Sequence, residues 1–210
     1  MDDKGSERLK RRRMQQGDML HRSSATLLDP SAILIGIDPV IERRRYPKPE
    51  ILSAFGSIDD LLVRIAERKA ALLAAPLVDC GRIVDLQFVR CVLTDFGRLA
   101  WNEYSTSIIA LVRLMMTEGA RSPGLKKRIY KVGPFSVTCQ LRQFFTKAHG
   151  AGVLNAPQAN LAAEHLLGML REPLYEALML NPATASASNG AGKVSASVDL
   201  VLDGCKRGRA

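Results

Sequence analysis

The stretch "RRRYPKPEILSAFGSIDDLL", Arg43 to Leu62, encloses a short apolar segment between two signals that limit helices. Pro47 and Pro49 precede the segment, and Gly56 follows it. Proline is tolerated in the first turn of a helix because its fixed φ suits that position, whereas glycine commonly follows the last turn. The pattern therefore predicts a short helix from Glu50 to Phe55.

A longer helix is predicted to begin directly after the glycine. Ser57 can cap its first turn, and Asp59 and Asp60 place negative charge near the positive end of the helix dipole. Upstream, Asp38 caps another short predicted helix, Pro39 to Arg44. A short helix between two such limits, after three arginines, can present its side chains to a DNA groove. The same pattern is also typical of an ordinary helical corner.

The composition favours helices over sheets. Hydrophobic residues make up 47% of the 210 residues but aromatic residues only 5%, so the core must consist of Leu, Ala, Val, Ile and Met. The formal net charge of +9 favours a polyanionic partner such as nucleic acid or an acidic membrane surface. Residues 1–56 hold 11 Lys and Arg against 8 Asp and Glu, so they contribute only +3 of this charge. Residues 1–16, with "KRRR" at 10–13, are predicted to form a flexible basic arm.

Several functional classes receive no support from the residues. Four cysteines without Cys-x-x-Cys spacing and only three histidines predict neither a zinc site nor a disulfide framework. No nucleophile lies beside a base at an interpretable spacing and no phosphate-binding loop is found, so we predict no catalytic residue, no metal and no cofactor. Without an apolar run of about 18 residues or an N-terminal signal, we expect no membrane partner and a cytoplasmic location.

A first short helix is predicted in "DMLHRSSATLL", Asp18 to Leu28, with Asp18 as its cap. From Ser57 onward the chain predicts six longer helices, giving about nine helices in an all-α protein. Two of them are expected to be separated near Gly97 to Trp101. The sequence Ser122-Pro123-Gly124 predicts a break, and Gly133-Pro134 predicts a kink in the following helix. Glu172-Pro173 predicts a bend in the next helix, and Val194 lies in the last one.

This order of elements resembles the TetR family of one-component transcriptional regulators along nearly the whole chain. In that family an acidic residue opens the second helix, and a short recognition helix ends in phenylalanine shortly before the fourth helix begins. The matching positions here are Asp38, Val40, Lys48, Pro49, Ile51, Phe55, Ser57 and Leu61. The segments "LVRLMMTEGARSPGLKKRIYKVGPF", Leu111 to Phe135, and "NLAAEHLLGMLREPLYEALM", Asn160 to Met179, look like the C-terminal domain of the family's AefR-like branch.

The resemblance implies a helix-turn-helix DNA-binding domain at residues 17–56 and a ligand-binding and dimerisation domain at residues 57–210. In a helix-turn-helix, phosphate contacts fix the register while the second helix reaches base edges. The DNA-binding residues so implied are Arg43, Arg44, Arg45, Tyr46, Lys48, Glu50 and Ser53. For the arginines, a solvated helix end is the alternative reading.

The resemblance also implies a ligand cavity in the larger domain. Met and aromatic side chains adapt to varied apolar ligands, although core packing is the alternative for each of them. The candidate ligand-binding residues are Phe88, Trp101, Tyr104, Met115, Met116, Phe135, Gln140 and Phe144. The last helices would form a four-helix interface with a second copy, and the candidates for this homodimer interface are Leu161, His165, Leu166, Met169, Leu170, Val198 and Val201.

Two functions from different classes follow. The first is a dimeric transcriptional regulator, a repressor, which binds a palindromic operator in double-stranded DNA and responds to a small apolar or aromatic effector. The second is a helical dimer of the same fold that has lost specific DNA binding and binds a small molecule or a protein. The second is motivated by departures from the family: Arg45 replaces the turn glycine, Pro47 the serine-type cap, and Leu52, Ser53 and Ala54 the tyrosines and basic residue.

Overall fold

The structure is a computed structural model, and it describes residues 7, 10, 14, 16–21, 48–118, 122–179 and 190–205. Within these ranges it contains nine α-helices between Lys48 and Gly204 (α3 to α11), one π-helical turn, a further helical segment near the N-terminus and no strand, which confirms the all-α prediction. Residues 16–21 are helical. The predicted helix Pro39 to Arg44 lies outside the described residues. No helix in the described ranges is long and apolar enough to cross a membrane.

The chain divides into two compact units. Unit 1 comprises residues 1–67 and 110–129, and unit 2 comprises residues 68–109 and 130–210. Unit 1 therefore combines the N-terminal part of the chain with a segment from its middle. The predicted functional boundary between residues 56 and 57 stays a prediction.

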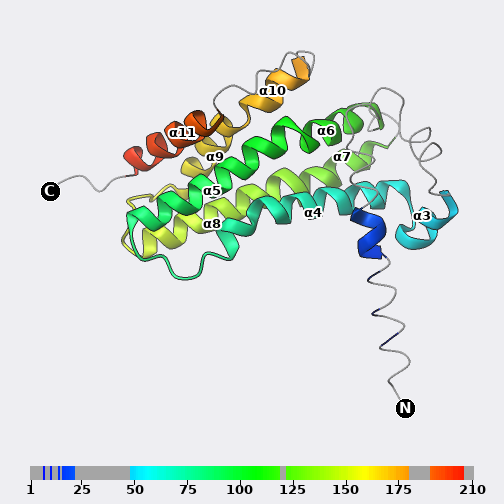
Figure 1. Cartoon of the computed structure of the whole chain (residues 1–210), viewed down its shortest axis with the longest axis horizontal. Coiled ribbons are helices and arrows are strands. Elements are labelled where there is room, and N and C mark those ends of the chain that lie inside the picture. Colours follow the sequence, from blue (N-terminus) through cyan, green and yellow to red (C-terminus); the bar gives the residue numbers. More distant parts are fainter. Residues whose placement is uncertain are drawn as a thin grey trace. The chain divides into compact units, whose positions relative to one another are not determined.

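Unit 1 contains α3 (Lys48–Phe55), the first turns of α4 (Ile58–Val78), most of α6 (Ser107–Glu118) and α7 (Pro123–Tyr130). Figure 1 shows α3 as a short helix followed directly by the much longer α4. Each helix buries residues at helical spacing, as expected for amphipathic helices. The buried residues include Ile51, Leu61, Leu62, Ile65, Leu114, Leu125 and Ile129.

Unit 2 consists of the rest of α4, α5 (Leu86–Ser105), the π-helical turn η1 (Lys131–Phe135), α8 (Ser136–Gly150), α9 (Ala159–Leu170), α10 (Glu172–Met179) and α11 (Gly190–Gly204). Helix α11 packs against both α5 and α9, and α9 also packs against α8 (Figure 1). The centre of this core is fully buried and includes Phe96, Phe144, Phe145, Leu141 and Leu93.

The predicted break near Gly97 to Trp101 is wrong, because α5 runs through these residues to Ser105. Gly97 is buried, and a Cβ atom built on it would lie 2.7 Å from Val194 Cγ1 and 3.5 Å from Leu170 Cδ2. The glycine is thus required for close packing of α11 and α9 on α5 rather than for ending a helix. The helix is capped at Thr106, whose hydroxyl group donates to the Asn102 carbonyl at 2.7 Å.

The two predicted proline irregularities are present at the predicted places. Gly133-Pro134 lies in the π-helical turn between α7 and α8, where proline cannot donate the hydrogen bond that a regular α-helix needs. At Glu172-Pro173 the sequence predicted a bend within one helix, whereas the structure has two separate helices there. Helix α9 ends at Leu170, Arg171 forms a turn, and α10 begins at Glu172 with proline in its first turn.

Candidate functional site

Helix α3 has one deeply buried residue and an exposed outer side. Ile51 is 1% exposed and anchors the helix. Pro49, Glu50, Leu52 and Ser53 are all exposed. A short helix with one deeply buried residue leaves these four side chains accessible to a partner, whereas Phe55 is half-buried.

The turn after α3 is held by local hydrogen bonds. Gly56 has a φ of +84°, a left-handed conformation that glycine adopts without strain, and its N–H donates to the Leu52 carbonyl at 2.8 Å. Ser57 then caps α4, because its hydroxyl accepts from the Asp60 N–H at 3.0 Å. The same hydroxyl donates to Asp60 Oδ2 at 2.7 Å. These contacts confirm the predicted cap at Ser57 and resemble a capping box.

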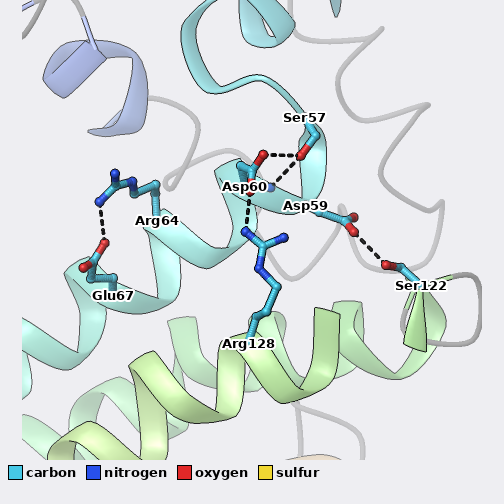
Figure 2. Close-up of polar contacts among 7 residues, drawn as sticks. All are labelled: Ser57, Asp59, Asp60, Arg64, Glu67, Ser122 and Arg128. Atoms are coloured by element: carbon cyan, nitrogen blue, oxygen red, sulfur yellow. Dashed lines mark hydrogen bonds and ion pairs between the residues drawn. The ribbon is translucent and has the colours of Figure 1, made fainter. Parts of the chain in front are cut away.

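The first turn of α4 is also bound by one residue just before α7 and one in its last turn (Figure 2). The Ser122 hydroxyl donates to Asp59 Oδ2 at 2.7 Å. The Arg128 guanidinium forms an ion pair with Asp60 Oδ1. We call these four residues, Ser122, Arg128, Asp59 and Asp60, the α4–α7 clamp.

Asp60 is the centre of this hydrogen-bond network. The hydrogen bonds from Ser57 and Arg128, with the positive charges of Arg128 and Arg64, hold the pKa of Asp60 below its ordinary value, although burial acts in the opposite direction. The carboxylate therefore stays ionised at neutral pH, so the ion pair with Arg128 persists there.

The predicted DNA-binding residues fall into two groups. Arg43, Arg44, Arg45 and Tyr46 lie outside the described residues. Lys48, Glu50 and Ser53 lie on α3, where the side chains of Glu50 and Ser53 are exposed. Their roles stay predictions.

The predicted ligand-binding residues lie in different surroundings. Phe144 and Tyr104 are buried in the core of unit 2, and Phe88 and Trp101 are half-buried against it. Met116 on α6 is 64% exposed, and Phe135 in the π-helical turn is 50% exposed. Gln140 on α8 and Met115 on α6 are half-buried.

Trp101 is covered by the start of α11. A Cβ atom on Gly190 would collide with Trp101 Nε1, so the glycine permits the helix to lie against the indole ring. The ammonium group of Lys193 lies 5.6 Å from the centroid of that ring, within the range of a cation–π contact. Lys193 Nζ also pairs with Glu172 Oε2 at 2.9 Å, and this hydrogen bond raises the pKa of Lys193.

A groove of about 580 Å³ lies between α9 and α11. Four of the predicted dimer residues, Leu161, His165, Met169 and Val201, line it. The other three, Leu166, Leu170 and Val198, are completely buried within unit 2. All seven lie on α9 and α11, and helical spacing could not distinguish the outward side of these helices from the side that faces α5 and α8.

Several residues at these sites escaped the sequence analysis. Leu200 and Gly204 line the groove, and Leu200 is 65% exposed. Ser122 and Arg128 bind the start of α4 from more than 60 positions away in the sequence. For Ser122 the proline break after it was the only local signal, and for Arg128 there was none, because a long-range ion pair leaves no periodic pattern.

Comparisons with known proteins agree with this architecture. The AefR-like transcriptional repressor C-terminal domain matches residues 92–204, more than half of the chain. The chain therefore belongs to the TetR family of transcriptional regulators, with an AefR-like C-terminal domain. A search of curated protein sequences finds no match.

Three solved structures share the fold. A regulator from Mesorhizobium loti MAFF303099, assigned to the TetR family, has a TM-score of 0.74 at 16% identity and covers 94% of this chain and 99% of its own. The flavonoid-responsive regulator FrrA has a TM-score of 0.60 at 22% identity and covers 93% and 99%. The TetR-family regulator PfmR from Thermus thermophilus has a TM-score of 0.57 at 17% identity and covers 84% and 92%.

Proposed function

We propose that this protein is a cytoplasmic, homodimeric DNA-binding repressor whose affinity for a palindromic operator is controlled by a small apolar or aromatic effector. The proposal rests on the length of α3 and on the exposure of its side chains. This helix is short, with one buried anchor, Ile51, and an outer side of exposed residues, and it is stopped by Gly56 and followed by a capped α4. A helix of this kind can enter a major groove.

The α9–α11 groove is the surface through which the two copies associate in this proposal. Leu161 is 44% exposed and Leu200 65% exposed, which leaves apolar area for a partner. A Cβ atom built on Gly168 has no neighbour within 4 Å, so the partner's helices can approach the backbone closely there. Two-fold symmetry would place the two copies of α3 about one DNA turn apart, roughly 34–36 Å.

The effector is proposed to be aromatic or apolar because the candidate residues of unit 2 are largely aromatic. FrrA, which shares the fold at 22% identity, is by its name responsive to flavonoids. Flavonoids are therefore sensible first probes. Trp101 is the only tryptophan of the chain, so quenching of its fluorescence by a flavonoid would report binding directly.

The proposed repressor is tested by selection from random-sequence duplexes at several salt concentrations. We expect a palindrome to be enriched and its affinity to fall steeply as salt rises, because counterions are released from neutralised phosphates. Adding a quenching flavonoid should then weaken operator binding. Saturating effector that left DNA affinity unchanged would disprove the proposed control.

One observation favours the second function, a dimer without specific DNA binding. The exposed side of α3 carries an acidic residue, Glu50, and an apolar one, Leu52, which is 42% exposed. Acidic side chains oppose a phosphate backbone. Weak binding with no enriched sequence in the same selection would support this second function and reject the repressor.

A further inference from the structure

We propose that Ser122 and Arg128 of the α4–α7 clamp are positioning residues that set the orientation of α3 through the first turn of α4. The inference rests on the proposed function in so far as α3 is the DNA-reading helix. Neither residue lies on α3, so each would act on DNA binding through other side chains.

The contacts are specific at both carboxylates. Ser122 binds Asp59 Oδ2 at 2.7 Å, and Arg128 pairs with Asp60 Oδ1 (Figure 2). Adjacent aspartates are thus bound by two residues six positions apart, one before α7 and one within it. These two polar contacts add to the packing of the neighbouring buried Leu61, and together they restrict both the tilt and the rotation of the α4 start.

Asp60 connects this clamp to the turn that precedes it. One carboxylate oxygen pairs with Arg128, and the other accepts from the Ser57 hydroxyl at 2.7 Å. Only Gly56 and Ser57 separate α4 from α3. A change in the position of Arg128 is therefore transmitted through Asp60 and Ser57 to the end of α3, across a turn too short to absorb it.

Helix α7 is a firm support for these contacts. Leu125 and Ile129, one helical turn apart, are each 1% exposed, so α7 is anchored on its inner side. Its chain continues through the π-helical turn directly into α8. The clamp thus connects the start of α4 to a helix that leads into the unit with the proposed effector residues.

The clamp should influence orientation more than stability. The side chains of Arg128 and Asp60 are 47% and 41% exposed, and ion pairs between exposed side chains contribute little to folding. Removing such an ion pair should lower the DNA affinity of each DNA-reading head by about threefold. The two heads of a dimer would together lose about tenfold in DNA affinity.

Two variants and a matched control test the proposal. Arg128→Ala removes the ion pair, and Ser122→Ala removes the hydrogen bond to Asp59. Lys127→Ala removes the same charge from the neighbouring exposed position of α7 and serves as the control. Arg128→Lys keeps the charge and should restore part of the lost function.

The first measurement is amide hydrogen exchange of residues 51–62 in the full-length protein without DNA. Faster exchange in Arg128→Ala and Ser122→Ala, with Lys127→Ala unchanged, is the expected result. Unchanged exchange in both clamp variants would overturn the proposal. Because no DNA is present, this result stands whether or not the protein binds an operator.

The second measurement is the affinity for the selected operator. We expect a loss of about tenfold in Arg128→Ala, a smaller loss in Arg128→Lys and little change in Lys127→Ala. Equal losses in Arg128→Ala and Lys127→Ala would show that charge alone matters and would reject positioning. If the wild-type protein enriches no sequence, the proposed function fails, and hydrogen exchange alone decides whether the clamp orients α3.

Discussion

The corner formed by α3, α4 and α7 and the core of unit 2 differ in the side chains that hold them together. At the corner, aliphatic side chains such as Ile51 and Leu125 are buried, and the ion pair between Arg128 and Asp60 joins α7 to α4 at the surface. In unit 2, the aromatic residues Phe96, Phe144 and Phe145 are enclosed by the surrounding helices with almost no exposed surface. A single substitution at the corner can therefore remove an exposed ion pair of small energetic worth, whereas one in unit 2 removes a buried ring.

The largest effect is expected from truncating the core. Phe144→Ala should lower the free energy of unfolding by about 3–5 kcal/mol, because it creates a cavity at a residue that is 1% exposed. Phe135→Ala removes the same ring at a position that is 50% exposed and should cost much less. Denaturant unfolding at equal protein concentration compares the two, and similar losses would contradict the contrast between core and surface.

Next in size is a pair of glycine substitutions. Gly97→Ala should destabilise unit 2 by about 1–3 kcal/mol, because the new Cβ would lie 2.7 Å from Val194 Cγ1. Gly168→Ala has no neighbour within 4 Å and should leave the folding of a single copy unharmed. Thermal unfolding measures both, and equal stability of the two variants would show that α11 can move away from α5 without cost.

A charge in the α9–α11 groove should separate the two copies. Leu200→Glu places a carboxylate at a position that is 65% exposed and lines the groove, so we expect the dimer to weaken by at least about tenfold because an unpaired charge would be buried. Leu72→Glu, at an apolar position on α4 that is 47% exposed, is the control. Analytical ultracentrifugation across a concentration series compares the dimerisation of the two variants. A Leu200→Glu variant that still dimerised like the wild type would contradict an interface at the α9–α11 groove.

The smallest effect is expected at Asp60. Its pKa is lowered in the folded protein, so its charge contributes stability that is present above the unfolded pKa of about 4. This contribution is lost as the pH falls through the lower folded pKa. Asp60→Asn should thus be less stable than wild type by less than about 1 kcal/mol at pH 7, and the difference should shrink below about pH 4. Urea unfolding at pH 7, 4 and 3 measures it, and a gap that widened with acid would reverse the assigned sign.

Local sequence patterns predicted several elements of the fold. The prolines at 47 and 49, Gly56 and Ser57 predicted the position of α3 and the start of α4 almost to the residue, and Gly133-Pro134 located the π-helical turn. These features depend on a few neighbouring residues, on φ restrictions and on caps, so a single sequence contains them. The predicted helix break at Gly97 was wrong because the glycine makes room for Val194, which is distant in sequence.

The sequence by itself thus determined the helical class, the position of α3, the start of α4 and the resemblance that led to the family. Only the tertiary structure decided which side of α9 and α11 faces outward, so that Leu200 lines the groove while Leu166 and Val198 are buried. It also brought Ser122 and Arg128 to Asp59 and Asp60. The physical reason is that helix propensity and capping act within a few residues, whereas packing and ion pairs join residues whose distance along the chain carries no information about their distance in space.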